Sequence, residues 1–467
     1  MKLKELFTAR DMTEGAPWKR IAEFAVPMLL GNLAQQLYNT ADTVIVGRYV
    51  GDNALSAVGS AAPILNLLLA LFVGVSTGAG ICVSQYFGAR NRELLSRTIG
   101  NCITLSAIAT GLIMVVGTAV AMPLLRLLGT PESIIYWCAD YLHIFFLGSG
   151  GFFFYNMLSG VLRGMGDSLS ALLYLLLATA LNVALDIVFV ASFGMGVPGV
   201  ALATVLAQFI SAFACLHKLL KMRDIFDLNW EQLKLKKNYA LRIIKIGLPS
   251  GVTQAIFSIS MLAVQSITNT LGEMVIACDV MIVRVDGFAM MPNMSFGQAM
   301  SVYTGQNVGA KLPERVKSGR RQGLALAVGT ATVMTAAIVL LGHHLFGIFT
   351  ETEELIDLAV RMMRILAFGY ICVSVTQVLG GVMRGAGDTV TPMWISLGTT
   401  ILFRVPMAYL CIWLSRTEEF PKGQPQALFI SLLMAWMLGA IVSSVAFARG
   451  KWKRSMEESW RQMEAEA

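Results

Sequence analysis

Residues 158–168 read LSGVLRGMGDS, and residues 379–389 read LGGVMRGAGDT. Seven of these eleven positions are identical, and 221 residues separate the two copies. A second pair of stretches repeats at the same offset, because Gln85, Gly88, Ala89 and Arg90 return as Gln306, Gly309, Ala310 and Lys311. Two independent matches in one frame predict an internal duplication whose unit is half of the 467-residue chain. We therefore expect two homologous lobes.

The composition predicts a membrane protein. Hydrophobic residues make up 56% of the chain and charged residues only 14%, with a mean hydropathy of +0.66. An ordinary soluble domain carries about 25% charged residues. Apolar runs long enough to cross a bilayer as helices, about 20 residues each, recur along the whole sequence. The expected fold class is an all-α integral membrane protein.

Twelve membrane-spanning helices are predicted, six in each half of the chain. They divide the protein into an N-terminal lobe at 1–217, a cytoplasmic linker at 218–245, a C-terminal lobe at 246–448 and a cytoplasmic tail at 449–467. The linker is the one long charged connection. The predicted spans are 21–46, 54–78, 94–121, 134–158, 169–192, 198–217, 246–270, 275–303, 322–349, 356–380, 390–414 and 427–448.

The positive charges predict the orientation. With both termini inside, 28 Lys and Arg residues fall in inner segments and 4 in outer loops, which is a strong positive-inside bias. The net charge of +7 then reflects topology and contact with anionic lipid, so no nucleic-acid partner is expected. Residues 1–20 place five basic side chains around apolar ones and predict a short helix on the membrane surface.

Polar side chains line the first predicted span. Asn32, Gln35, Asn39 and Asp42 are spaced by three or four residues, which places them on one helix face. The fifth span carries Asn182 and Asp186, and the sixth carries Thr204 and Gln208, each pair four residues apart. A carboxylate near the middle of the bilayer costs about 2.5–3.5 kcal/mol. Small polar residues often only hold helices together, but for the two acids we favour a functional role.

The second lobe does not repeat these acids. At the 221-residue offset, Asp42 becomes Ala263 and Asp186 becomes Met407. The second lobe instead carries Asp279, Arg284, Asp286 and Arg404 within predicted spans. Two acids and two arginines can neutralise one another, so we favour structural ion pairs over a coupling role for this set.

Other motifs indicate turns or packing. Residues 194–199 (GMGVPG) match the glycine pattern of a dinucleotide site, but they lie between two apolar spans and contain Pro198, so we expect a tight turn. The R-G-x-G-D phrases are likewise turns, whose glycines allow a positive φ. Seven scattered cysteines and four histidines offer no metal site, no disulfide pattern and no nucleophile with a base. We expect neither an enzyme nor a bound metal or cofactor.

These sequences resemble the multidrug and toxic compound extrusion (MATE) transporters. The likeness covers nearly the whole chain and is carried by PMLLGNLAQQLYNTADTVIVG in span 1, LNVALDIVF in span 5, FGMGVPGVALATVLAQ through span 6, and the two repeated phrases. It implies two six-helix lobes that form a V around a central cavity. It also implies cation-driven export of organic compounds, many of them cationic and aromatic.

The resemblance also implies roles for individual residues. The first-lobe cation site of the family matches at Asp42, Asn182, Asp186 and Thr204, and its drug contacts match at Gln35, Tyr38 and Asn156. The sodium-driven branch has a glutamate in span 7, but residues 246–270 contain no carboxylate. Span 10 also lacks an acid in the middle of the helix, which argues against a sodium site in the second lobe. Asp286 matches an acid in span 8 of some members.

We therefore expect a proton-coupled multidrug exporter that works by alternating access. It should lie in the inner membrane of a prokaryote, with both termini in the cytoplasm, as a monomer. Its partners should be membrane lipid and small organic cations. Sodium coupling is the main alternative, because the same oxygen atoms suit that ion. A related flippase for lipid-linked or saccharide cargo is another, although it would need a basic cavity.

Overall fold

The computed structural model describes residues 9–418 and 420–466, and these residues form helices, turns and irregular segments without a strand. They divide into two compact units. Unit 1 comprises residues 1–11, 27–251 and 466–467, and unit 2 comprises residues 12–26 and 252–465. Two long helices pass from one unit into the other, α2 (Pro17–Tyr49) near Pro27 and α10 (Lys237–Thr270) near Gly251.

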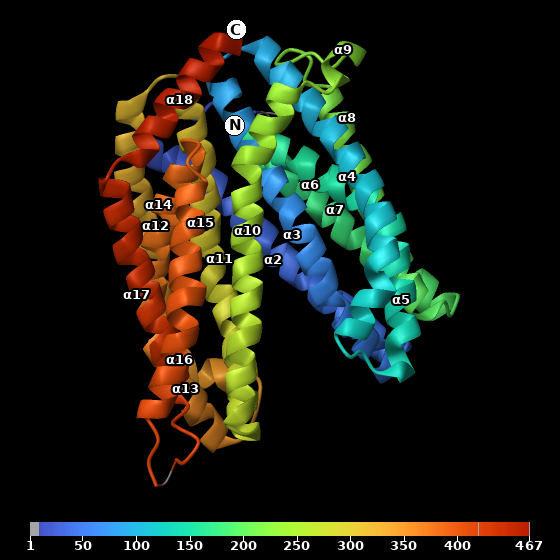
Figure 1. Ribbon diagram of the computed structural model, residues 1–467, viewed down its shortest axis with the longest axis vertical. Helices are drawn as coiled ribbons and strands as arrows, with labels where there is room; N and C mark the ends of the chain where they lie inside the picture. Colours follow the sequence, from blue (N-terminus) through green and yellow to red (C-terminus); the bar gives the residue numbers. More distant parts are fainter. Residues whose placement is uncertain (1–8, 419, 467) are drawn as a thin grey trace. The chain divides into compact units, whose positions relative to one another are not determined.

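Unit 1 is built from α3 to α9 together with most of α2 and the first part of α10. Figure 1 shows these helices in blue to green, with α6 packed against α3 and α8, and α7 against α8. Their bounds are α3 Asp52–Gly88, α4 Arg92–Leu127, α5 Glu132–Leu147, α6 Ser149–Gly164, α7 Ser168–Asp186, the π-helix η1 Ile187–Ser192, α8 Gly196–Leu220 and α9 Trp230–Leu233.

Unit 2 is built from α11 to α18 together with the second part of α10. Its centre is α14, which packs against α11, α12 and α17. The bounds are α11 Glu273–Gly309, α12 Pro313–Gly347, α13 Glu353–Ala367, α14 Gly369–Gly385, α15 Val390–Ser396, the π-helix η2 Leu397–Phe403, α16 Arg404–Leu414, α17 Gln426–Ala448 and α18 Lys451–Glu466.

The duplication is visible in the backbone. Helices α3 and α11 both have 37 residues, and each follows a glycine with a positive φ, which is 104° at Gly51 and 108° at Gly272. The R-G-x-G-D phrases form turns as predicted, with φ of 84° at Gly166 and 95° at Gly387. Only glycine adopts such angles without steric cost. The paired glycines therefore preserve the same chain reversals in both halves.

Each of the twelve predicted spans lies on helical residues, but several are not single straight helices. The fourth and tenth spans are bent pairs, α5 with α6 at 52° and α13 with α14 at 40°. Among the described residues, eight helices are long and apolar enough to cross a membrane, or ten if each bent pair is one span. The other two predicted spans are α2 and α11, which are long enough but carry the polar and charged side chains noted above. A helix satisfies its own backbone hydrogen bonds, which is what a bilayer requires.

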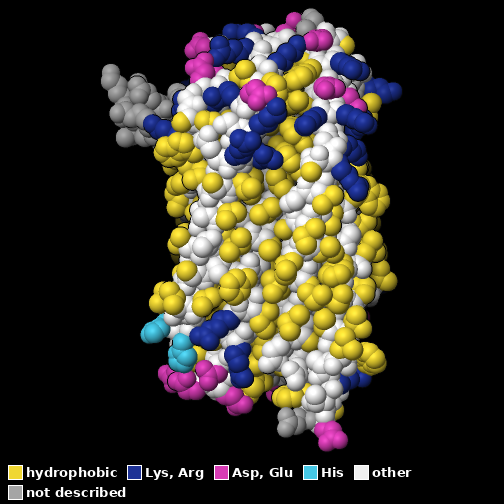
Figure 2. Space-filling model, turned by 90° about the vertical axis from the view of Figure 1, so that its left-hand side faces the viewer, with side chains coloured by type: hydrophobic (Ala, Val, Ile, Leu, Met, Phe, Trp, Pro, Cys, Tyr) yellow, Lys and Arg dark blue, Asp and Glu magenta, His cyan; other side chains and the backbone are white. Residues whose placement is uncertain are grey.

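The surface agrees with a membrane environment. Figure 2 shows hydrophobic side chains over the broad middle of one face, with Lys and Arg gathered toward one end. Exposed apolar residues on α12 and α17 include Val333, Leu340 and Ile441. Side chains of this kind are stable when they face lipid. A surface helix was expected at residues 1–20. Residues 9–16 are not helical, and α2 begins only at Pro17. Residues 1–8 lie outside the described part.

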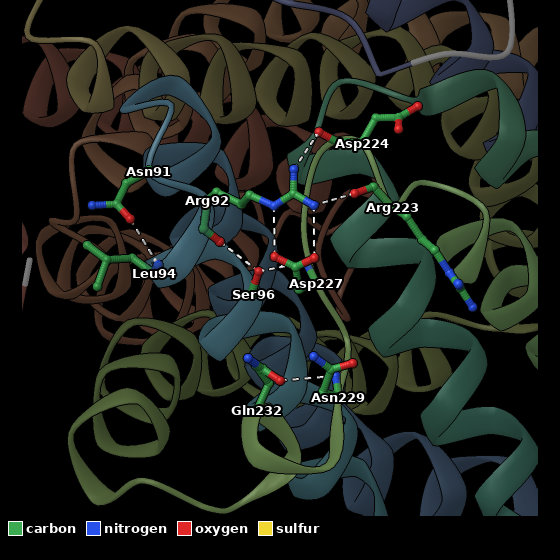
Figure 3. A network of polar contacts seen from close by, with 9 residues as sticks. All are labelled: Asn91, Arg92, Leu94, Ser96, Arg223, Asp224, Asp227, Asn229 and Gln232. Carbon is green, nitrogen blue, oxygen red and sulfur yellow. Dashed lines mark hydrogen bonds and ion pairs between the residues drawn. The ribbon is translucent and has the colours of Figure 1, made fainter.

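Several residues of α4, Arg92 among them, hold the segment between α8 and α10. Arg92 donates two hydrogen bonds of 2.8 Å to the carboxylate of Asp227, and it also bonds the carbonyl oxygens of Arg223 and Asp224. Ser96 accepts a bond from the Asp227 backbone N–H, as Figure 3 shows. The predicted linker is therefore an ordered segment that contains α9 and is held against the start of α4.

Candidate functional site

Three helices of unit 1 bring the predicted cation residues together. Asn182 and Asp186 lie one helical turn apart on α7, and both side chains are completely buried. Thr204 on α8 is 8% exposed, and α2 contributes Tyr38 and the half-buried Asp42. All five belong to unit 1, so the cluster lies inside one compact unit.

The Thr204 hydroxyl is the polar centre of this cluster. It lies 3.5 Å from the hydroxyl of Tyr38 and accepts a hydrogen bond of 3.3 Å from the amide of Asn182. It donates in turn to the backbone oxygen of Val200, at 3.1 Å. One hydroxyl group therefore connects α2, α7 and α8.

The two carboxyl groups lie close together. Asp42 and Asp186 lie within hydrogen-bonding reach of one another. Among the described residues, no donor reaches either oxygen of Asp186, nor Oδ1 of Asp42 or of Asn182. Ionised carboxylates only accept hydrogen bonds, and buried oxygens that lack a donor are costly. The arrangement can be satisfied by a proton held between the two acids or by a small cation.

The three expected drug contacts are placed differently. Tyr38 belongs to the Thr204 cluster. Gln35 is exposed on α2, and its amide lies 3.5 Å from the side-chain oxygen of Asn39. Asn156 on α6 donates to the carbonyl of Phe152 in its own helix, at 2.8 Å. The structure records no direct contact among these three side chains.

Two features of the site were missed by the sequence reasoning. Tyr141 on α5 is nearly buried and lies close enough to Asp42 and Asp186 to interact with them electrostatically. The π-helix η1 begins immediately after Asp186. Such wider turns are rare and frequently occur at functional sites. No spacing pattern in the sequence marks either feature, because both depend on how separate helices pack.

The four charged residues of unit 2 that were expected to form ion pairs are only partly brought together. Asp286 on α11 accepts a hydrogen bond of 2.9 Å from Tyr370 on α14. Arg404, the first residue after η2, interacts electrostatically with Asp286 and Asp279, but none of the ion pairs recorded for the described residues includes it. Arg284 is exposed. Tyr370 was not anticipated, although a buried tyrosine hydroxyl usually finds a partner.

Comparison with known proteins finds similar sequences and similar folds. The chain is 29% identical to the "Probable multidrug resistance protein YoeA" of Bacillus subtilis (strain 168), over 93% of this chain and 96% of that protein. It is 24% identical to a structure described as the outward-facing conformation of a multidrug resistance MATE family transporter of the MOP superfamily. The TM-score is 0.88, with 96% of this chain and 99% of that chain covered.

A second structure carries a different functional description. It is a MOP superfamily transporter from Pyrococcus furiosus, for which a binding pocket of reversed polarity is said to suggest a different function. Its TM-score is 0.86 at 24% identity, over 95% of this chain and 98% of that chain. These two structures establish the fold that the chain shares with them.

The family model described as MatE matches the chain twice, at residues 27–188 and 249–410. The two matches are equal in length and lie one in each half, as the internal repeat predicts. Together they cover more than half of the sequence. The protein therefore belongs to the MatE family, that of the multidrug and toxic compound extrusion transporters.

Proposed function

We propose that this protein exports organic cations, including structurally varied drugs, in exchange for protons that bind at Asp42 and Asp186. The observation that carries the proposal is the pair of neighbouring carboxyl groups whose buried oxygens lack donors among the described residues. The name of the Bacillus subtilis relative supports the drug class. The alternating-access cycle and the inner-membrane location with both termini inside are expectations from the resemblance and from the charge distribution.

Exchange follows from competition for one negative charge. A proton bound between the acids removes charge that a cationic drug would otherwise use, so the two ligands weaken each other's binding. Linkage requires the two effects to be equal in size. A proton that enters with the membrane potential supplies about 2.3 kcal/mol per 100 mV. That free energy can move a drug against its gradient.

Within the site we assign two groups of residues. Asp42 and Asp186 bind the proton, while Asn182 and Thr204 orient them through the hydrogen bonds around the threonine hydroxyl. Tyr38 is the drug contact that responds to protonation of the two acids, because its hydroxyl lies beside that of Thr204. Gln35 and Asn156 contribute further polar contacts to the drug. No cofactor enters this scheme.

Sodium is the competing coupling ion. Carboxylate, amide and hydroxyl oxygens are the ligands that hard cations prefer, and Asn182 Oδ1 has no donor among the described residues. Sodium would satisfy these oxygens together, whereas a proton satisfies two of them. Transport under separate proton and sodium gradients distinguishes the two ions.

The proposal is tested by ethidium accumulation in intact cells. Cells with the wild-type protein should keep ethidium low, and cells with Asp186→Asn should accumulate it as fast as cells without the protein. Asp140→Asn is the matched control, because Asp140 is an exposed acid on α5. The proposal fails if Asp186→Asn, inserted at wild-type levels, exports ethidium as well as the control.

A further inference from the structure

The repeated Q-x-x-G-A-[RK] motif is not explained by transport at Asp42 and Asp186. In unit 2, the second copy of the motif holds two remote parts of the chain. Gln306 accepts a hydrogen bond of 2.8 Å from the backbone N–H of Met12. Lys311 pairs with Glu464 of α18, and the Trp460 indole donates to the carbonyl of Val308 at 2.6 Å.

The first copy, at the end of α3 in unit 1, also holds remote parts of the chain. Arg90 pairs with Asp11 at 3.0 Å. Gln85 and Tyr86 are both buried, and they contact Arg242 of α10. The two copies of the motif thus share a role as docking points for distant segments, within their separate units.

The Arg242 guanidinium carries a buried charge. Its side chain is 6% exposed. It donates to Gln85 Oε1 at 2.8 Å and to the hydroxyl of Tyr86 at 2.6 Å, and its guanidinium carbon lies 4.9 Å from the centre of the Tyr86 ring. These partners are neutral. A buried cation needs an opposite charge, because neutral partners replace only part of its lost hydration.

Glu466, the last described residue of α18, supplies that charge. Its Oε2 accepts a hydrogen bond of 2.6 Å from Tyr86 and lies 3.6 Å from Nη1 of Arg242. Tyr86 therefore accepts from the arginine and donates to the carboxylate at the same time. Among the ion pairs recorded for the described residues, this is the one that includes Arg242. Glu466 belongs to unit 1, so the contact lies within a single unit.

We propose that Gln85, Tyr86 and Arg242 form a carboxylate-binding site within unit 1, and that Glu466 is its internal ligand. Its chemistry suits a carboxylate because a cation and a hydroxyl converge on one oxygen, and charge-assisted hydrogen bonds are about twice as strong as neutral ones. Glu466 is thus held at this site by the ion pair with Arg242, while Glu464 and Trp460 of α18 contact Lys311 and Val308 in unit 2. This proposal does not rest on the coupling ion or on the drug.

Hydrogen exchange of the full-length protein in lipid nanodiscs tests the docking. Glu466→Gln should accelerate amide exchange in the last turn of α18 about tenfold, the change that about 1.4 kcal/mol of lost stability produces. Glu458→Gln is the matched control, since Glu458 is an exposed residue of the same helix. Equal exchange in these two variants and in the wild type would overturn the proposal.

A second experiment tests the chemical specificity of the site. Glu466→Ala removes the internal ligand, so sodium propionate should raise the unfolding temperature of this variant more than sodium chloride at equal ionic strength does. The added Arg242→Gln substitution should remove the difference. If propionate and chloride act alike on folded Glu466→Ala protein, the site does not recognise carboxylates and the proposal is wrong.

Discussion

The carboxyl groups of Asp42 on α2 and Asp186 at the end of α7 lie within hydrogen-bonding reach of each other inside unit 1. Asp186 is completely buried. Two adjacent carboxylates in a site of low dielectric constant repel each other and cannot both ionise cheaply. Such a pair binds and releases its protons as a unit. The proton exchange that we propose rests on this property.

The Thr204 hydroxyl should orient this site without carrying charge. Thr204→Val keeps the shape of the side chain but removes the contacts with Asn182 and Tyr38. Each hydrogen bond contributes about 0.5–1.5 kcal/mol, so the rate of drug export should fall by about tenfold. Thr204→Ser should retain most of the rate. Export rates per inserted molecule in vesicles measure the difference, and equal rates for the two variants would contradict an orienting role.

The charges of unit 2 should act structurally. Asp286 is held by Tyr370, and Arg404 lies near it. Removing one member of a buried charged pair typically costs about 3–5 kcal/mol. Asp286→Asn and Arg404→Gln should each lower the yield of folded protein, and the double variant should recover part of it. Fluorescence-detected gel filtration measures the yield. A normal yield with abolished export in Asp286→Asn would instead assign this residue to coupling.

The contact between α3 and α10 depends on glycine. A Cβ atom at Gly78 would lie 2.5 Å from the Cα of Gly247, and one at Gly74 would meet the backbone of Gly251 as closely. Gly78→Ala should therefore separate the helices at a cost of about 1–3 kcal/mol, which is typical of overpacking. Gly59→Ala, on the same helix, has open space at its Cβ and should preserve or raise the stability. Thermal unfolding measures the stability of both variants. Equal stabilities would contradict the close packing of α3 against α10.

The linker anchor should weaken in acid. The hydrogen bonds from the Arg92 guanidinium hold the pKa of the Asp227 carboxyl below its ordinary value of 3.8. A lowered pKa in the folded state means that the carboxylate stabilises the fold above that ordinary value. This contribution disappears as the pH falls through the lowered pKa. Amide exchange of residues 222–236, corrected for its intrinsic pH dependence, should therefore rise below about pH 4. In Asp227→Asn this segment should exchange at the faster, acid-like rate at every pH. A wild-type segment that remains protected at low pH would contradict the anchor.

Much of the fold was predictable because the duplication is visible in short repeated motifs. The repeated R-G-x-G-D and Q-x-x-G-A-[RK] phrases fix turns, and at the second motif even Arg90 and Lys311 share a positive φ, of 54° and 56°. Spacing on single helices placed Asp42, Asn182, Asp186 and Thr204 on polar helix faces, and their role in coupling stays a prediction. The bends beside Gly148 and Gly369 and the two π-helices were not predicted. They arise from packing between helices, which a hydrophobic pattern does not encode.

The contacts that join distant residues were also beyond sequence reasoning. Tyr370 meets Asp286 and Glu466 meets Arg242 because helices far apart in the chain pack together. The sequence predicted arginine partners for Asp286 but gave no sign of Tyr370. The tail at 449–467 was expected only as a cytoplasmic segment, yet its residues form α18, and Glu466 pairs with Arg242.

Drug transport in proteoliposomes under separate ion gradients tests the coupling most directly. Purified wild-type protein should move ethidium when a pH gradient is imposed and sodium is absent. A sodium gradient with equal pH on both sides should give no transport above that of Asp186→Asn. Full transport under the sodium gradient alone would contradict proton coupling at Asp42 and Asp186.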